Sequence, residues 1–215
     1  PRQLREQIGQ AASLITFFRQ TPSRVMDIGH PVPWFPAWGV SFPRPVEDVR
    51  SVVAVFNEWR PSNRWLLVAF EVVASEVHLW TTWYALKRGE ESGSMVANSP
   101  DAEFLRLISG THQISKAFER AGLRERDVAA WIVALPEAAP GEEFGGYEIP
   151  RTSYIDMSLE ADRLIEHLGG SLMPKRPVPS EQGLLRLEAK TDESGLPLWR
   201  IEECYMSHMA LSDMR

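Results

Sequence analysis

The sequence predicts an α/β fold, with a small mixed sheet and a central group of helices in a single domain. Two nearly unbroken apolar runs, at residues 65–73 and 128–136, are typical of strands that are covered on both faces. Amphipathic segments lie between and around these runs. Since such segments bury one face, we expect them to pack as helices on the sheet.

The composition is that of an ordinary soluble domain. The 215 residues carry a formal charge of −6, and 44% of them are hydrophobic, which excludes disordered and fibrous proteins. No charge-free stretch reaches the roughly 18 residues that a bilayer span needs, so we expect no membrane segment. The single cysteine, Cys204, cannot form an internal disulfide. We therefore expect a cytoplasmic protein.

The first 45 residues differ from the rest of the chain. Residues 4–20 have apolar side chains at helical spacing, which predicts a helix. The proline-rich segment 30–45 is incompatible with a helix and reads as extended chain, with one edge strand at 38–42. We therefore assign residues 1–45 to an N-terminal extension.

The remaining residues, 46–215, read as the α/β domain. Besides the two apolar strands, one more strand is expected at 184–190. Spacing, capping residues and breakers predict helices at 46–56, 73–88, 100–109, 112–121, 158–167 and 198–214. In the last helix the residues expected on the core side are Leu198, Ile201, Cys204, Tyr205, His208, Met209 and Leu211.

The helix expected at 73–88 has an unusually wide apolar surface. Leu79, Trp83 and Leu86 form a second apolar stripe beside the one that a single packing face requires. Such a helix either lies between two layers of the protein or contacts another protein through part of its surface.

Few residues form a pattern with catalytic or metal-binding chemistry. Cys204 and His208 are spaced as a pair of metal ligands, but a structural zinc needs two more, so core packing is favoured and no metal or cofactor is expected. Glu71, Glu76 and His78 offer a remote acid/base alternative for a hydrolase. The motifs of nucleotide-binding loops and nucleophilic hydrolases do not occur. The sequence therefore favours a protein that is not an enzyme.

The eight tryptophans raise a second hypothesis. Trp34 and Trp38 lie in a proline-stiffened segment that could display aromatic platforms to a sugar ring or another small ligand. The tryptophans of the expected strands and helices are better explained by packing. A carbohydrate or small-ligand binding module is therefore the alternative function.

Residues 65–137 resemble the small accessory subunit of the KEOPS complex. The features that carry the resemblance are an apolar strand followed by HLWTTWYALKRG, then MVANSPDAEFLRLISGTHQISKAFERAGL, then the strand VAAWIVAL. The final helix also resembles the closing helix of that family. The resemblance implies a non-catalytic adaptor of the assembly that installs threonylcarbamoyladenosine in tRNA, with no DNA partner.

The resemblance also implies two binding surfaces. One would contact the kinase-like ATPase subunit of the complex, with Leu79, Trp83 and Leu86 as candidates. The other would hold the single-stranded CCA end of tRNA through cations, for which the candidates are Lys87, Arg88, Arg106 and Lys116. Relatives tend to carry basic residues just after the position of Lys87 and Arg88, whereas this chain carries Glu90 and Glu91 there.

Overall fold

A computed structural model of the chain describes residues 34–140, 147–148, 151–189 and 195–213. The chain divides into two compact units, Pro1–Phe35 and Pro36–Arg215. The helix expected at 4–20 lies outside the described residues. The architecture below is that of the second unit.

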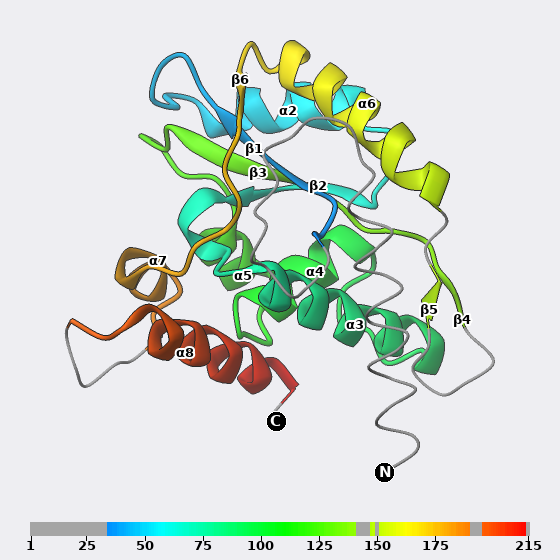
Figure 1. The fold of residues 1–215 in the computed structure, drawn as a ribbon, viewed down its shortest axis with the longest axis vertical. Helices are drawn as coiled ribbons and strands as arrows, with labels where there is room; N and C mark the ends of the chain where they lie inside the picture. The colour runs from blue at the N-terminus through cyan, green and yellow to red at the C-terminus, as the bar shows by residue number, and fades with distance from the viewer. Residues whose placement is uncertain (1–33, 141–146, 149–150, 190–194, 214–215) are drawn as a thin grey trace. The chain divides into compact units, whose positions relative to one another are not determined.

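The second unit contains a four-stranded sheet, which confirms the α/β class (Figure 1). Every pairing is antiparallel, so the expectation of a mixed sheet is wrong in this respect. In spatial order the strands are β2 (Trp65–Ala69), β3 (Ala129–Ala134), β1 (Ala37–Ser41) and β6 (Ser171–Met173). A separate two-stranded pair consists of β4 (Ala139–Pro140) and β5 (Tyr147–Glu148).

Strand β1 is an inner strand rather than the expected edge strand. Gly39 is paired with Trp131 of β3 on one side and with Met173 of β6 on the other. The prolines of this segment, Pro36 and Pro43, flank the strand, so every residue within it keeps the backbone N–H that two-sided pairing requires. The sheet thus includes residues before position 46, and the second unit begins at Pro36.

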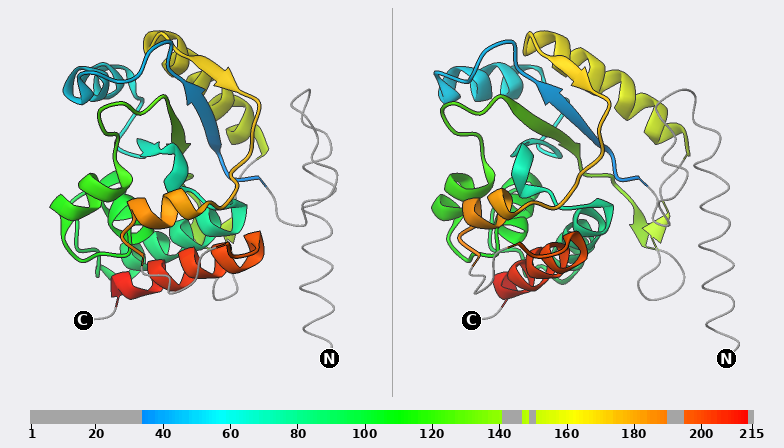
Figure 2. Two further views of the ribbon diagram at one scale, coloured as in Figure 1. Left: turned by 90° about the vertical axis from the view of Figure 1, so that its left-hand side faces the viewer. Right: turned by 60° about the vertical axis from the view of Figure 1, so that its left-hand side comes forward.

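Helices α2 (Val49–Trp59) and α6 (Arg151–His167) cover one face of the sheet (Figures 1 and 2). Asp48 caps α2, where its carboxylate accepts a hydrogen bond from the backbone N–H of Arg50 at 2.9 Å. The core on this face joins alternate residues of the strands to both helices. Its members include Val40, Leu67, Ile132, Phe56 and Leu164.

Three further helices lie on the other face, namely α3 (Glu76–Ser92), α4 (Pro100–Ile108) and α5 (Ile114–Ala121). Helix α4 contacts both α3 and α5. The strand expected at 65–73 ends early, because a 3₁₀ turn, η1 (Phe70–Val72), follows β2. Trp131 holds this turn by donating a hydrogen bond from its indole nitrogen to the carbonyl of Phe70 at 2.9 Å.

Two C-terminal helices complete the unit. Helix α7 (Glu181–Arg186) occupies part of the strand expected at 184–190, so that expectation is wrong. The Ser180 hydroxyl accepts a hydrogen bond from the N–H of Gly183 at 3.1 Å and starts a helix there. Helix α8 (Leu198–Ala210), followed by the 3₁₀ turn η2 (Leu211–Asp213), packs on α3 and α4 on the side away from the sheet (Figure 2).

Within the described part of the chain, no helix combines the length and the apolar character that a bilayer span requires.

Candidate functional site

The residues expected to contact a kinase-like partner are buried. Leu79, Trp83 and Leu86 are 0%, 2% and 0% exposed. The indole of Trp83 also donates a hydrogen bond to the carbonyl of Pro136 at 3.1 Å. The expectation that this stripe forms an exposed interface is therefore wrong. Its width arises because α3 packs on both α4 and α8.

Two of the four cations expected to bind tRNA are engaged within the protein. The ammonium of Lys87 is largely buried and lies 2.8 Å from the carboxylate of Glu90. Arg106 is buried, with Nη2 2.7 Å from Glu103 and Nη1 donating to the carbonyl of Ser212 at 2.8 Å. Arg106 thus joins α4 to the C-terminal turn and is not accessible to a phosphate.

The other two expected cations, Arg88 and Lys116, are exposed. They lie on α3 and α5, between which α4 packs, so the structure does not bring them together. Lys116 instead lies near Glu188, as do Arg120 and Arg124. A hydrogen bond from Arg120 and the charges of the other two cations lower the pKa of the Glu188 carboxyl. Lys116 and Arg120 lie one helical turn apart on α5, and Arg124 follows the end of that helix.

The carboxylates of the hydrolase hypothesis form structural ion pairs. Glu71 lies 3.3 Å from Arg186, and Glu76, which is buried, accepts a hydrogen bond from Nε of Arg176 at 2.6 Å. Arg176 also donates to the carbonyl of Ala37 at 2.7 Å and so ties the start of α3 to β1. Both carboxylates therefore join parts of the fold through ion pairs with arginine residues.

His78, the third member of that hypothesis, is buried. Its Nδ1 accepts a hydrogen bond from the N–H of Ala74 at 3.3 Å, and its ring meets Tyr205 edge to face. Burial, together with the charge of His208, lowers the pKa of His78 to about 3. The ring is thus neutral at physiological pH. The structure gathers no accessible acid/base site around Glu71, Glu76 and His78.

The structure also places Trp38, from the predicted aromatic display, and His208, from the possible pair of metal ligands. Trp38 is buried on β1, where it stacks on Trp65 with a centroid separation of 5.9 Å, so it cannot act as a platform. His208 places Nε2 3.0 Å from the carbonyl of Ser109. Across the described ranges, no three His, Cys, Asp or Glu side chains are grouped to hold a metal ion.

Helix α8 is fixed on the core by its inner face. Ile201, Tyr205 and Met209 are its buried residues. The Tyr205 hydroxyl lies 2.8 Å from the carbonyl of Glu71, to which it donates, and 3.0 Å from that of Ser180. Burial raises the pKa of Tyr205 to about 12, so the hydroxyl keeps its proton.

Two glycines allow the close approach of α8 to its neighbours. A Cβ at Gly183 would overlap the Tyr205 hydroxyl and the Glu71 carbonyl. A Cβ at Gly110 would overlap the backbone and the ring of His208, and Gly110 also has a φ of 61°. The orientation of α8, and hence of its outer face, is set by these contacts.

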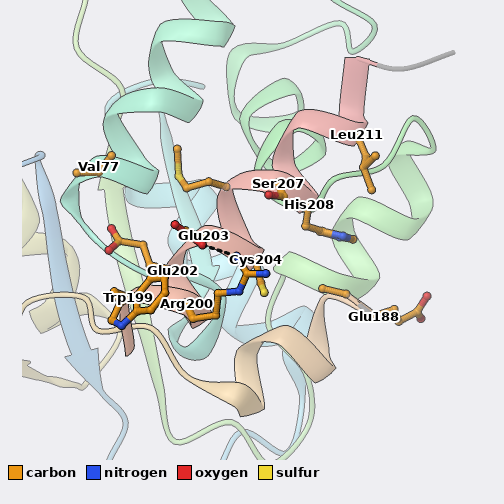
Figure 3. Close-up of a pocket in the computed structure, with 12 residues that line it drawn as sticks. Val77, Glu188, Trp199, Arg200, Glu202, Glu203, Cys204, Ser207, His208 and Leu211 are labelled. Carbon is orange, nitrogen blue, oxygen red and sulfur yellow. Dashed lines mark hydrogen bonds and ion pairs between the residues drawn. The ribbon is translucent and has the colours of Figure 1, made fainter. Parts of the chain in front are cut away.

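The outer face of α8 is an exposed apolar surface. Leu198, Trp199 and Leu211 are 58%, 63% and 48% exposed, although the first and last were expected on the core side. A shallow groove of about 910 Å³ runs along this face (Figure 3). Its apolar lining comes from α8 and its 3₁₀ extension, from α3 and from the residues after α7, namely Trp199, Met206, Leu211, Val77 and Ala189.

Charged residues flank the apolar lining of this groove. Glu188, Glu202 and Glu203 supply three carboxylates, and Arg200 supplies one guanidinium, 2.6 Å from Glu203. Figure 3 shows Glu202 on the side of α8 that carries Trp199, one turn away. An apolar floor with a charged border is an arrangement suited to protein binding.

Comparisons with known proteins do not assign the chain to a family. No family model matches it, and no curated protein matches it.

Proposed function

We propose that the chain is a non-catalytic adaptor subunit of an assembly that installs threonylcarbamoyladenosine in tRNA. In this function it binds the kinase-like ATPase of that assembly and assists in holding the CCA end of tRNA. The observation that carries the proposal is the exposed apolar outer face of α8, defined by Leu198, Trp199, Met206 and Leu211. Exposed apolar surface bordered by charge is typical of a docking site.

The resemblance of residues 65–137 to the KEOPS accessory subunit supports the choice of partner. The docking surface, however, is assigned to the outer face of α8 and not to α3, whose candidate residues are buried. Trp199 is the leading anchor, because tryptophan residues dominate the binding energy of many protein interfaces.

For tRNA, the supporting surface is the basic group on and after α5. Lys116 and Arg124 are exposed and lie near the Arg120–Glu188 ion pair. Exposed cations of this kind bind the phosphates of single-stranded nucleic acid. Because few phosphates would be neutralised, we expect weak binding by this chain alone and tighter binding by the assembly.

Co-expression with the kinase-like ATPase of the same organism tests the proposal. We expect a stoichiometric complex by size-exclusion chromatography with light scattering, and faster tRNA modification by the reconstituted assembly when the chain is added. A chain that forms no complex and leaves the modification rate unchanged would contradict the proposal. Of the two tryptophans of the carbohydrate-binding alternative, Trp38 is buried in the core and Trp34 is half-buried.

A further inference from the structure

Glu188 adopts a backbone conformation that glycine usually provides. It directly follows Leu187, the C-cap of α7, and its φ is 58°. Its N–H donates to the carbonyl of Leu185 at 3.0 Å, and the N–H of Ala189 donates to the carbonyl of Leu184 at 2.9 Å, which ends the helix. Because a Cβ disfavours positive φ, a side chain at this position has a cost that glycine would avoid.

The ion pair of Glu188 with Arg120 of α5 does not account for this cost. The Glu188 side chain is 64% exposed, so water screens its attraction to the guanidinium. Helix α7 is joined to the end of α5 by Arg186 instead, which donates to the carbonyl of Gly122 at 2.7 Å and to that of Arg120 at 3.3 Å. The carboxylate of Glu188 is therefore not required to hold the two helices together.

This carboxylate lies among three cations. A hydrogen bond from Arg120 and the charges of Lys116 and Arg124 lower the pKa of Glu188. Between positions 116 and 126 the chain carries four cations and two carboxylates. Glu188 therefore cancels half of the excess positive charge on and after α5.

The guanidinium of Arg120 is only partly used by Glu188. Its Nη2 donates to the carboxylate, whereas its Nε is buried and has no hydrogen-bond partner within the described part of the chain. Nε and Nη2 form an edge through which arginine can bind two oxygens of one carboxylate or phosphate. The present anion thus leaves half of this edge unsatisfied.

From these contacts we infer that Lys116, Arg120 and Arg124 form a site for a phosphate group, in which Glu188 is a resident anion that the phosphate displaces. The inference rests on the proposed function in taking single-stranded RNA as the source of the phosphate. The Glu188 side chain is already mostly exposed, so it returns to water with little rearrangement.

The resident carboxylate also determines which phosphates bind. A free phosphate must overcome the competition of Glu188 alone, whereas the other phosphates of an RNA strand contribute further contacts to the same binding event. Glu188 therefore selects the polymer over free phosphate.

Fluorescence anisotropy of a labelled single-stranded RNA tests the inference with the full chain. The variants are Glu188→Gln and the matched control Glu125→Gln, which removes an exposed carboxylate next to Arg124. We expect Glu188→Gln to raise the affinity by about threefold or more and the control to raise it by less than about 1.5-fold. Equal gains would show that only the general field had changed, and would overturn the inference.

The gain from Glu188→Gln must depend on the cations of the site. We expect it to disappear in an Arg120→Gln background and to shrink in Lys116→Gln, which alters an exposed side chain. Thermal unfolding verifies the fold of each variant, and the Lys116 background decides the matter if Arg120→Gln does not fold. An undiminished gain in a folded background would contradict the site.

Glu188→Gly separates displacement from a structural role. Glycine suits the φ of 58°, so this variant should bind RNA as tightly as Glu188→Gln and unfold at a temperature no lower than wild type. A marked fall in the unfolding temperature would show that the carboxylate is a structural partner of Arg120, and the inference would be wrong.

Two further outcomes separate this inference from its alternatives. If calorimetry shows that inorganic phosphate binds wild type as tightly as RNA does, the site takes free phosphate and the inference is wrong. If the chain binds the ATPase and speeds modification while Glu188→Gln leaves RNA affinity unchanged, the adaptor function stands and the phosphate site is wrong. If the ATPase does not bind but Glu188→Gln raises RNA affinity through Arg120, the adaptor function is wrong and the phosphate site stands.

Discussion

Tyr205 donates a hydrogen bond from its hydroxyl to the carbonyl oxygen of Glu71, 2.8 Å away, and this bond joins α8 to the turn that follows β2. Gly183 of α7 lies against the same two groups, because a Cβ there would overlap both of them. The three elements meet at a point where no side chain fits between them. The placement of α8 depends on this contact.

Gly183→Ala is expected to lower the free energy of unfolding, because the new methyl group must displace α7 or break the Tyr205 bond. The matched control is Gly89→Ala within α3, where the nearest atom to a Cβ would be in the side chain of Met95, at 3.4 Å. The control should stabilise the protein by about 0.5 to 1 kcal/mol, as alanine does inside a helix. Urea unfolding measures both. If both variants change the free energy of unfolding equally, the position of α7 does not depend on the close approach of Gly183 to Tyr205 and Glu71.

Trp83→Ala is expected to cost about 3 to 5 kcal/mol of stability, because it removes a buried ring and leaves a cavity between α3 and its neighbours. Trp199→Ala is the same chemical change at an exposed position and should cost less than about 1 kcal/mol. Denaturant titration of the two variants makes the comparison. A folded Trp83→Ala protein of normal stability would restore α3 as a candidate interface.

Stability is expected to fall on acidification through His78. The folded pKa of about 3 lies below the usual value near 6.5, so the unfolded chain takes up a proton between these pH values while the folded chain does not. The contribution is complete above about pH 6.5, and its loss amounts to about 2 kcal/mol between pH 7 and pH 5. Urea unfolding of wild type and His78→Phe at both pH values isolates it. An NMR titration in which the His78 ring protonates near pH 6 would contradict the assignment.

Three of the four expected tRNA contacts should separate into two classes. Lys116→Gln and Arg88→Gln remove exposed cations, and each should reduce the slope of log affinity against log salt by about 0.7 wherever the cation contacts a phosphate. Lys87→Gln should leave that slope unchanged, because its ammonium is paired with Glu90. Titration of tRNA with and without its CCA end measures the slopes. A larger effect from Lys87 than from Lys116 would place the RNA at the end of α3.

The helices and strands were predictable where a single sequence signal, such as a helix cap or a long apolar run, was stronger than the others. The Ser99–Pro100 pair and the apolar run 128–136 mark a helix start and a strand that the structure contains. The segment 184–190 was misread because Leu184, Leu185 and Leu187 fit a short strand as well as a helix. Only the Ser180 cap distinguishes the two, and it lies outside the apolar run.

The candidate site was less predictable, for a physical reason. Sequence periodicity shows how wide the apolar surface of a helix is, but not which part of it another element covers. For α3 the wide arc predicts an exposed interface, whereas its residues are buried in a helix that packs on both α4 and α8. For α8 the exposed side chains of Leu198 and Leu211 were assigned to the core, and Trp199 was overlooked among the charged residues beside it.

Occupation of the outer face of α8 can be tested directly at Cys204, because this single cysteine lines the groove. The measurement is the rate at which a maleimide modifies Cys204 in the free chain and in the chain saturated with the kinase-like ATPase. The account predicts a rate several-fold lower in the complex, since an occupant of the groove covers the thiol. An unchanged rate in a complex shown to be fully formed would contradict the account.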